Sequence, residues 1–322
     1  MTNPFTRVIG QSQAIELLTQ AVLKERIAPA YLFAGPDGVG RSLTARCFVE
    51  LLFSTVADVS LHQRLRQGNH PSLLWVQPTY LHQGQQLSAA EAAEKGLKRK
   101  APPVIRLEQI RKITEFISRP PLSPPRNVVV LEQAETMAEA AANALLKTLE
   151  EPGKATIILI APKVESLLST LVSRCQRIPF YRLDTQAMAQ VLTQSGHSEI
   201  LAQSEVLSLA AGSPGQAIAH AQQLQDIPAQ LLQDVTIAPK SLRQSLELAR
   251  QIDKTLDSEA QLWLVDYLQQ SYWQLKRHPG IIQQLEQARK SLLCYAQPRL
   301  VWECTLMSIY RSSTQSLTQP QG

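Results

Sequence analysis

Two hydrophobic patterns alternate through the first half of the chain. Apolar residues recur at helical spacing in one set of segments, which covers residues 9–24, 42–53, 107–117 and 139–149. Short, continuous apolar runs lie between them, at residues 30–34, 73–76, 128–131 and 156–160. The first pattern predicts helices, and the second predicts strands buried on both faces. Strands that alternate with helices, the last of which runs toward Val172, predict a parallel sheet flanked by helices.

The second half of the chain has a different pattern. From Asp184 onward we find no convincing strand, only helical patterns separated by clusters such as AAGSPG at residues 210–215. Amphipathic helices are predicted over residues 264–275, 281–295 and 300–310. Three such helices in sequence predict an all-α domain, either a compact bundle or one part of an oligomeric collar.

One polar segment interrupts the α/β half. Residues 77–103 contain no apolar period long enough to fix a core element, so we expect a flexible surface insertion there. Its basic residues are Lys95, Lys98, Arg99 and Lys100. A solvated loop is the favoured interpretation of this cluster, and any contact with DNA would be directed at phosphates and sensitive to salt. A second, proline-rich loop is predicted at residues 120–125.

Composition limits the function without deciding it. A chain of 322 residues is long enough for two or three domains, and its net charge of +5 is too modest to establish DNA binding. The four cysteines, Cys47, Cys175, Cys294 and Cys304, form no CxxC pair, so we expect no zinc and no other metal site. No segment has the apolar length of a signal peptide or a membrane span, which predicts a cytoplasmic protein.

The strongest local motif is GPDGVGRS, which supplies Gly35, Gly38, Gly40, Arg41 and Ser42 between a predicted strand and a predicted helix. It fits the P-loop pattern except that Arg41 stands where lysine is expected. In a P-loop, backbone N–H groups surround the phosphates, lysine reaches the β and γ oxygens, and the hydroxyl holds Mg²⁺. Arginine is planar and differently shaped, so we expect catalysis to be lost more readily than weak binding of ATP or ADP. The alternative is a turn that only needs glycines.

Two further segments match weaker patterns. VVVLEQ resembles the strand that ends in Asp-Glu in active ATPases, but here the pair is Glu132 and Gln133. An amide is a poor proton acceptor, so Gln133 cannot replace the carboxylate that orients the attacking water. In the tripeptide Ser173-Arg174-Cys175, the arginine by itself is more simply explained as a solvated or paired surface residue.

Together with VIGQ at residues 8–11 and AANALLKTLEEP at residues 141–152, these motifs make the chain resemble the bacterial clamp-loader family of DNA polymerase III. The resemblance covers residues 5–222, and the last hundred residues match only in length and helical character. It implies an AAA+ P-loop domain over residues 1–180, a small helical lid over 181–224 and an all-α collar over 225–322. It also implies that Arg174 is an arginine finger that acts on a nucleotide held by a neighbouring subunit.

The departures from the active pattern resemble the delta-prime type within this family. Besides Arg41 and Gln133, the resemblance places the sensor of the γ phosphate at Pro162 and the sensor arginine of the lid at Gln216, and neither can serve. It therefore implies a largely non-hydrolysing accessory subunit of a polymerase holoenzyme, which requires no cofactor of its own. The implied partners are the gamma/tau and delta subunits in a hetero-pentameric ring, the sliding clamp and primed DNA.

The resemblance leaves one structural element unmatched and two functions open. Many delta-prime proteins carry a four-cysteine zinc module after the P-loop helix, and residues 54–69 lack it. One alternative function is a weakly active, gamma/tau-like ATPase in which Arg41 replaces lysine and Glu132 holds the metal. The other is a related AAA+ protein of recombination or repair.

Overall fold

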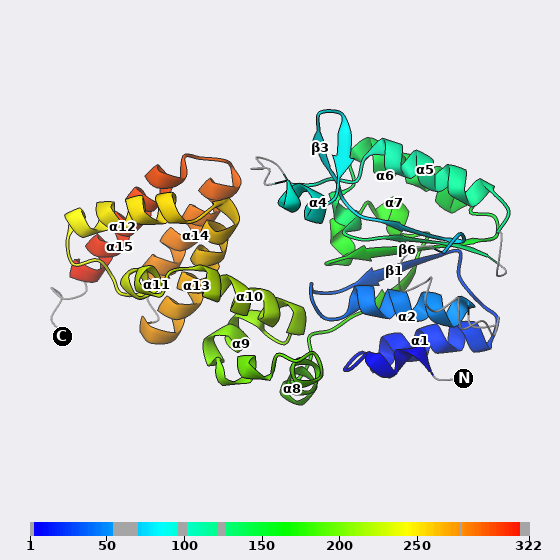
Figure 1. Cartoon of the computed structure of the whole chain (residues 1–322), viewed down its shortest axis with the longest axis horizontal. Coiled ribbons are helices and arrows are strands. Elements are labelled where there is room, and N and C mark those ends of the chain that lie inside the picture. Colours follow the sequence, from blue (N-terminus) through cyan, green and yellow to red (C-terminus); the bar gives the residue numbers. More distant parts are fainter. Residues whose placement is uncertain (1–2, 54–69, 96–101, 122–125, 277–278, 316–322) are drawn as a thin grey trace. The chain divides into compact units, whose positions relative to one another are not determined.

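The structure is a computed structural model that describes residues 3–53, 70–95, 102–121, 126–276 and 279–315 (Figure 1). The chain divides into two compact units, Met1–Val191 and Leu192–Gly322. The predicted three-way division into ATPase domain, lid and collar stays a prediction.

The first unit is built on a five-stranded parallel sheet with the strand order β2-β5-β6-β1-β7. The strands are β2 (Leu73–Val76), β5 (Asn127–Leu131), β6 (Ala155–Ala161), β1 (Ala30–Ala34) and β7 (Gln176–Pro179). Every residue of the three central strands is buried, which explains their continuous apolar sequences. Four of these strands and the parallel sheet confirm the prediction from hydrophobic pattern.

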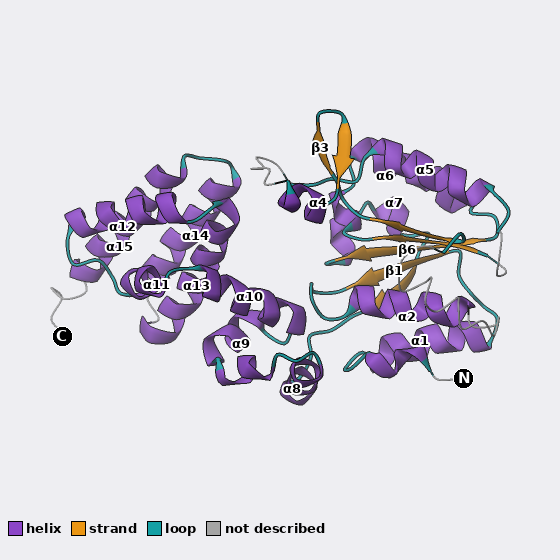
Figure 2. Ribbon diagram, in the orientation of Figure 1, coloured by secondary structure: helices purple, strands orange, loops and turns teal. Residues whose placement is uncertain are grey.

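Helices cover both faces of this sheet (Figure 2). On one face lie η1 (Pro4–Arg7), α1 (Ser12–Leu23) and α2 (Arg41–Phe53), and on the other α5 (Leu107–Ser118), α6 (Glu139–Glu150) and α7 (Ser169–Val172). Successive residues of β1 alternate between the two cores: Tyr31 and Phe33 pack with the helix α2 side, whereas Leu32 packs with the α5 and α6 side. The turns η2 (Ala134–Thr136) and η3 (Val164–Ser166) follow β5 and β6.

Two parts of this unit differ from the sequence prediction. Strand β7 was missed because it is a short edge strand, in which only Ile178 is fully buried and the first two residues are exposed. The segment 77–103 was expected to hold no core element, which is wrong: it contains β3 (Tyr80–His82), β4 (Gln85–Leu87) and α4 (Ala89–Glu94). β3 and β4 form an antiparallel hairpin, and Leu87 and Ala92 are buried. Lys98, Arg99 and Lys100 lie outside the described residues.

The second unit is helical throughout its described residues, as predicted. Helix α8 (Thr185–Gln194) lies at the division between the units, followed by η4 (Ser198–Ala202), α9 (Ser204–Ala210) and α10 (Pro214–Asp226). The remaining helices are α11 (Ala229–Thr236), α12 (Leu242–Thr255), α13 (Ser258–Lys276), α14 (Pro279–Leu293) and α15 (Pro298–Gln315). They share an aliphatic and aromatic core that contains Leu264, Tyr272 and Trp302.

Polar contacts connect α9 and α10 to α13 inside this second unit. The Trp263 indole donates a hydrogen bond to Nδ1 of His220 over 2.8 Å, and the Tyr267 hydroxyl donates one to Glu205 over 2.8 Å. Burial, together with the Glu205 hydrogen bond, raises the pKa of Tyr267 to about 12. Helices α9 and α10, which the sequence assigned to a lid, therefore contact α13, which it assigned to a collar, within one unit.

Candidate functional site

The glycine-rich loop lies between β1 and α2, as the motif predicts. Gly38 and Gly40 have φ angles of 75° and 100°, a region that glycine enters without steric cost. Helix α2 begins at Arg41, and the amide of Thr44 donates to the carbonyl of Gly40 over 2.9 Å. The loop therefore retains the backbone shape of a P-loop at a helix N-terminus.

Gly35 is required for a close approach between two strand ends. A Cβ atom at this position would lie 2.3 Å from the carbonyl oxygen of Phe180, just beyond β7. The amide of Phe180 donates to the carbonyl of Ala34 over 2.8 Å, which extends the β1–β7 ladder to the loop. Any larger residue at position 35 would push the edge strand away.

Gln11, from the VIGQ segment, connects the loop to the segment after β7. Its side chain is buried and donates from Nε2 to the carbonyls of Val39, at 3.2 Å, and Tyr181, at 2.7 Å. Its Oε1 atom accepts from the Tyr181 amide at 3.2 Å. One amide side chain thus fixes the loop against the connection that leads toward α8.

Arg41 is turned onto its own loop. Its side chain is only 8% exposed and forms an ion pair with Asp37, whose side chain is 57% exposed. Its Nη1 atom is buried and has no hydrogen-bond partner within the described residues. The cation that would reach the phosphates is thus engaged by a carboxylate four residues earlier in the loop.

Glu135 lies near the same charges. Burial raises the pKa of its carboxyl above the ordinary value, and the negative charge of Asp37 raises it further, whereas Arg41 opposes both. Its Oε2 atom is buried without a hydrogen-bond partner among the described residues. Two acidic groups therefore stand beside the phosphate loop, where an active site would favour positive potential.

The end of β5 carries Glu132 and Gln133. The Glu132 amide donates to the carbonyl of Val76 over 2.9 Å, and its carboxylate accepts a hydrogen bond from Gln77 Nε2 at 2.6 Å. Gln133 is exposed and has a left-handed φ of 50°. A carboxylate that could hold a metal is thus present at the edge, but the next position offers only an amide.

Pro162 lies beside the loop, at the end of β6. β6 pairs with β1, so that Ala161 stands opposite Ala34. Pro162 and Gly35 line a cavity of ≈ 320 Å³ with Phe180 and Tyr181. Proline has no N–H to donate, so nothing at this position can sense a phosphate. The residues present fit the shape of a phosphate loop but not ATP hydrolysis.

Gln216, where the resemblance places the sensor of the lid, belongs to the second unit. It lies in the first turn of α10, where its amide donates to the Oγ atom of the N-cap residue Ser213 at 3.3 Å. Its position fits an ordinary helix start. Its role as a degenerate sensor stays a prediction.

Arg174 lies at the amino-terminal ends of the strands, whereas the glycine-rich loop lies at their carboxyl-terminal ends. Arg174 comes two residues before β7 begins, and the register pairs Gln176 with Tyr31, near the start of β1. From Tyr31 to Gly35 the chain advances four residues along β1, or ~13 Å at about 3.3 Å per residue. Arg174 therefore cannot reach a nucleotide in its own loop without refolding of the unit.

The Arg174 guanidinium is held by two contacts. Nη2 pairs with Oε1 of Glu150, the last residue of α6, at 2.7 Å, and Nη1 donates to the carbonyl of Thr170 at 3.0 Å. The side chain is still 37% exposed. A partner that approaches this edge of the first unit can therefore contact it.

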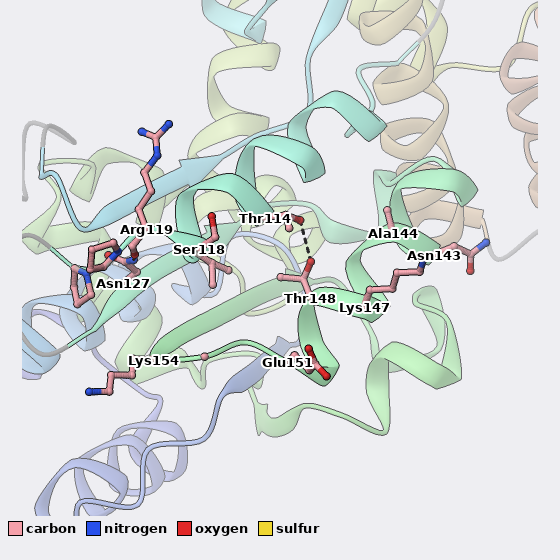
Figure 3. A pocket seen from close by; sticks show the side chains of 14 residues that line it. Thr114, Ser118, Arg119, Asn127, Asn143, Ala144, Lys147, Thr148, Glu151 and Lys154 are labelled. Atoms are coloured by element: carbon pink, nitrogen blue, oxygen red, sulfur yellow. Dashed lines mark hydrogen bonds between the residues drawn. The ribbon is translucent and has the colours of Figure 1, made fainter.

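A separate cavity of ≈ 1120 Å³ lies between α5, α6 and the amino-terminal ends of β5 and β6. Figure 3 shows the hydroxyls of Thr114 and Thr148 facing one another there, 3.0 Å apart. Its lining has mixed charge, with Arg119, Lys147 and Lys154 beside Glu151. None of the predicted site residues lines it.

Within the described part of the chain, no group of three His, Cys, Asp or Glu side chains could hold a metal ion. Residues 54–69, where a zinc module was considered, lie outside the described residues. Burial raises the pKa of Cys175 to about 11, and Cys47 is buried next to Arg7. None of the described helices has the length and apolarity needed to cross a membrane.

Sequence reasoning missed three residues of these sites, Asp37, Glu135 and Glu150. Asp37 lies inside the motif, and its spacing of four residues from Arg41 was a usable signal. Glu135 and Glu150 gave no such signal, because the pattern of a single sequence does not show which carboxylate lies beside which cation.

Comparisons with known proteins agree on one family. The family described as "DNA polymerase III, delta subunit" matches residues 10–184, and the family described as "Cyanobacterial DNA polymerase III delta prime, C-terminal domain" matches residues 186–309. The second match extends the resemblance into the last hundred residues, where sequence reasoning had found only helical character.

Individual relatives show the same likeness. The chain is 30% identical over 199 residues to DNA polymerase III subunit delta' of Bacillus subtilis, which covers 60% of this chain and 54% of that protein. It is 32% identical over 221 residues to subunit delta' of Pseudomonas aeruginosa, which covers 65% of this chain and 60% of that protein. The matched part is thus less than two thirds of either relative.

Among solved structures, a DNA polymerase III gamma subunit-related protein of Thermotoga maritima superposes with a TM-score of 0.53 at 17% identity. The superposition covers 93% of this chain and 99% of that one. This likeness concerns the fold, in which an AAA+-type parallel sheet flanked by helices is followed by a helical region.

Proposed function

Because the chain belongs to the delta-prime family of DNA polymerase III, we propose that it is a clamp-loader subunit that takes part in ATP-driven loading of the sliding clamp onto primed DNA. It acts as a largely non-hydrolysing subunit that donates Arg174 to the nucleotide of a neighbouring ATPase subunit. One observation carries the second part of this proposal. Arg174 is partly exposed at the amino-terminal ends of the strands, and its own phosphate loop lies at their carboxyl-terminal ends.

The state of its own loop supports a subunit that does not hydrolyse ATP. Arg41 pairs with Asp37, Gln133 offers no carboxylate, and Pro162 offers no donor. Hydrolysis needs a cationic group in contact with the transferred phosphate and a second group that orients the attacking water. The first is engaged within the chain, and the second is replaced by an amide.

The position of Arg174 supports action in trans. Arginine fingers accelerate phosphoryl transfer by roughly 10³ to 10⁵ where they complete another subunit's site. A finger must be exposed at a subunit boundary and must keep N–H groups for the phosphate. Arg174 meets the first condition by its exposure and the second because Glu150 and Thr170 engage only two of its five N–H groups.

The proposed function specifies partners and conditions. The chain occupies one position of a hetero-pentameric ring with gamma/tau and delta subunits, and it works in the cytoplasm, where primed chromosomal DNA is found. It needs neither zinc nor a nucleotide of its own.

Reconstitution tests this proposal. A loader is assembled from gamma/tau and delta subunits with and without the chain, and closed clamps on primed circular DNA are counted after ATP is added. We expect the chain to co-purify with the other subunits and loading to depend on it. Failure to co-purify, or equal loading without it, contradicts the proposal and favours an AAA+ protein of recombination or repair.

A further inference from the structure

The end of helix α6 meets the proposed finger. Glu150 is the last residue of α6, and its Oε1 atom lies 2.7 Å from Nη2 of Arg174. The carbonyl of Thr170, in the short helix α7, accepts from Nη1 at 3.0 Å. The guanidinium is thus fixed by one side-chain contact and one backbone contact.

Helix stability alone does not explain the place of Glu150. A carboxylate in the last turn of a helix faces the negative end of the helix dipole, which is unfavourable. Arg174 supplies the opposite charge there, across 24 positions of sequence. The contact instead determines where the guanidinium of Arg174 points.

We propose that Glu150 is a positioning residue for Arg174, an inference that rests on the proposed function. A long arginine side chain has many rotamers, and only some direct its fork toward a neighbouring subunit. The ion pair with Glu150, whose side chain is 53% exposed, selects among them before the phosphate is met, which lowers the entropic cost of the contact. Glu150 touches neither the nucleotide nor the reacting atoms in this account.

A carboxylate so close to the finger has a second electrostatic effect. It reduces the positive potential that a phosphate meets, so it acts as a brake if this effect outweighs its effect on orientation. The two roles predict opposite changes. If Glu150 positions the finger, its removal slows hydrolysis at the neighbouring site, and if it is a brake, its removal accelerates hydrolysis.

The test uses the assembled loader with the full chain. Rapid-quench measurement follows the first turnover of ATP after clamp and primed DNA are added. Comparison with an Arg174→Ala loader identifies the phase of hydrolysis that depends on Arg174. Glu150→Ala and Glu150→Gln are compared with Glu151→Ala. Glu151 is the matched control, since it lies one residue beyond Glu150, carries the same charge and has no ion pair within the described residues.

We expect Glu150→Ala to slow the finger-dependent phase about threefold to fivefold, the range that a partly exposed ion pair can supply. Glu150→Gln keeps an acceptor oxygen and should recover part of the rate, and Glu151→Ala should leave it unchanged. The Glu150→Ala/Arg174→Ala double variant should equal Arg174→Ala, because a positioning residue has no effect without the side chain that it positions.

Several results overturn the inference, and they are distinguishable. A rate increase in both Glu150 variants identifies a brake, and an unchanged rate means that the contact does not affect hydrolysis. Equal losses in Glu150→Ala and Glu151→Ala indicate a general effect of charge at the end of α6. If Arg174→Ala itself removes no hydrolysis, the proposed function fails and the role of Glu150 fails with it. Thermal melting of each variant separates these results from loss of folding.

Discussion

Removal of the Asp37 charge should open the phosphate loop to nucleotide. In the native chain, Asp37 competes with any phosphate for Arg41. The Arg41 side chain is only 8% exposed, and its Nη1 atom has no hydrogen-bond partner among the described residues. The Asp37 side chain is 57% exposed, so solvent weakens the pair, and we assign it about 1 kcal/mol. Loss of a competitor of this strength tightens phosphate binding about fivefold.

Isothermal titration with ADP measures this effect. We expect weak binding by the native chain and an approximately fivefold lower Kd for Asp37→Asn. Glu16→Gln is the control, because Glu16 is exposed on α1 and its substitution changes the net charge by the same amount away from the loop. Equal dissociation constants for the native chain and Asp37→Asn, or no binding by either, would refute the idea that this ion pair closes the loop.

Other predictions concern stability and reactivity. Gly35→Ala should cost about 2–4 kcal/mol in urea unfolding because its Cβ meets fixed backbone, whereas Gly153→Ala, strained only by a φ of 58° with open space around it, should cost about 1 kcal/mol. Because the pKa of Glu135 is raised, its protonated carboxyl group contributes stability at low pH, and this contribution is lost as pH rises through the pKa of the folded state. Glu135→Gln should therefore match the native Tm below pH 4.5 and exceed it near pH 7. With a thiol reagent at pH 8, exposed Cys294 should react well before Cys175, whose pKa is about 11, and mass spectrometry would identify either order.

The sequence predicted the parts of the fold that depend on continuous hydrophobic pattern. Strands β1, β5 and β6 are buried on both faces, so their apolar runs are unambiguous. Strand β7 is an edge strand with two exposed residues at its start, and the β3–β4 hairpin is polar and mostly exposed. Neither has a pattern that separates it from a loop, because backbone pairing rather than side-chain burial defines them.

The candidate site was predicted unevenly for a similar reason. The strand–loop–helix order places Gly35 and Arg41 at the carboxyl ends of the strands, and the resemblance adds Pro162 there, as the structure has them. The partners of the cations, Asp37 for Arg41 and Glu150 for Arg174, depend on side-chain directions that follow only from packing. These two contacts decide whether the Arg41 side chain is engaged within the loop and where the Arg174 guanidinium points.

The central claim, a non-hydrolysing subunit that lends Arg174, is tested most directly by steady-state ATP hydrolysis. The native chain alone is compared with loaders that contain the native chain or Arg174→Ala, each with clamp and primed DNA. The account predicts negligible turnover by the chain alone and a large loss of stimulated turnover in the Arg174→Ala loader. Robust turnover by the chain alone, unaffected by Arg174→Ala, would contradict the account and identify a working site built on Arg41 and Glu132.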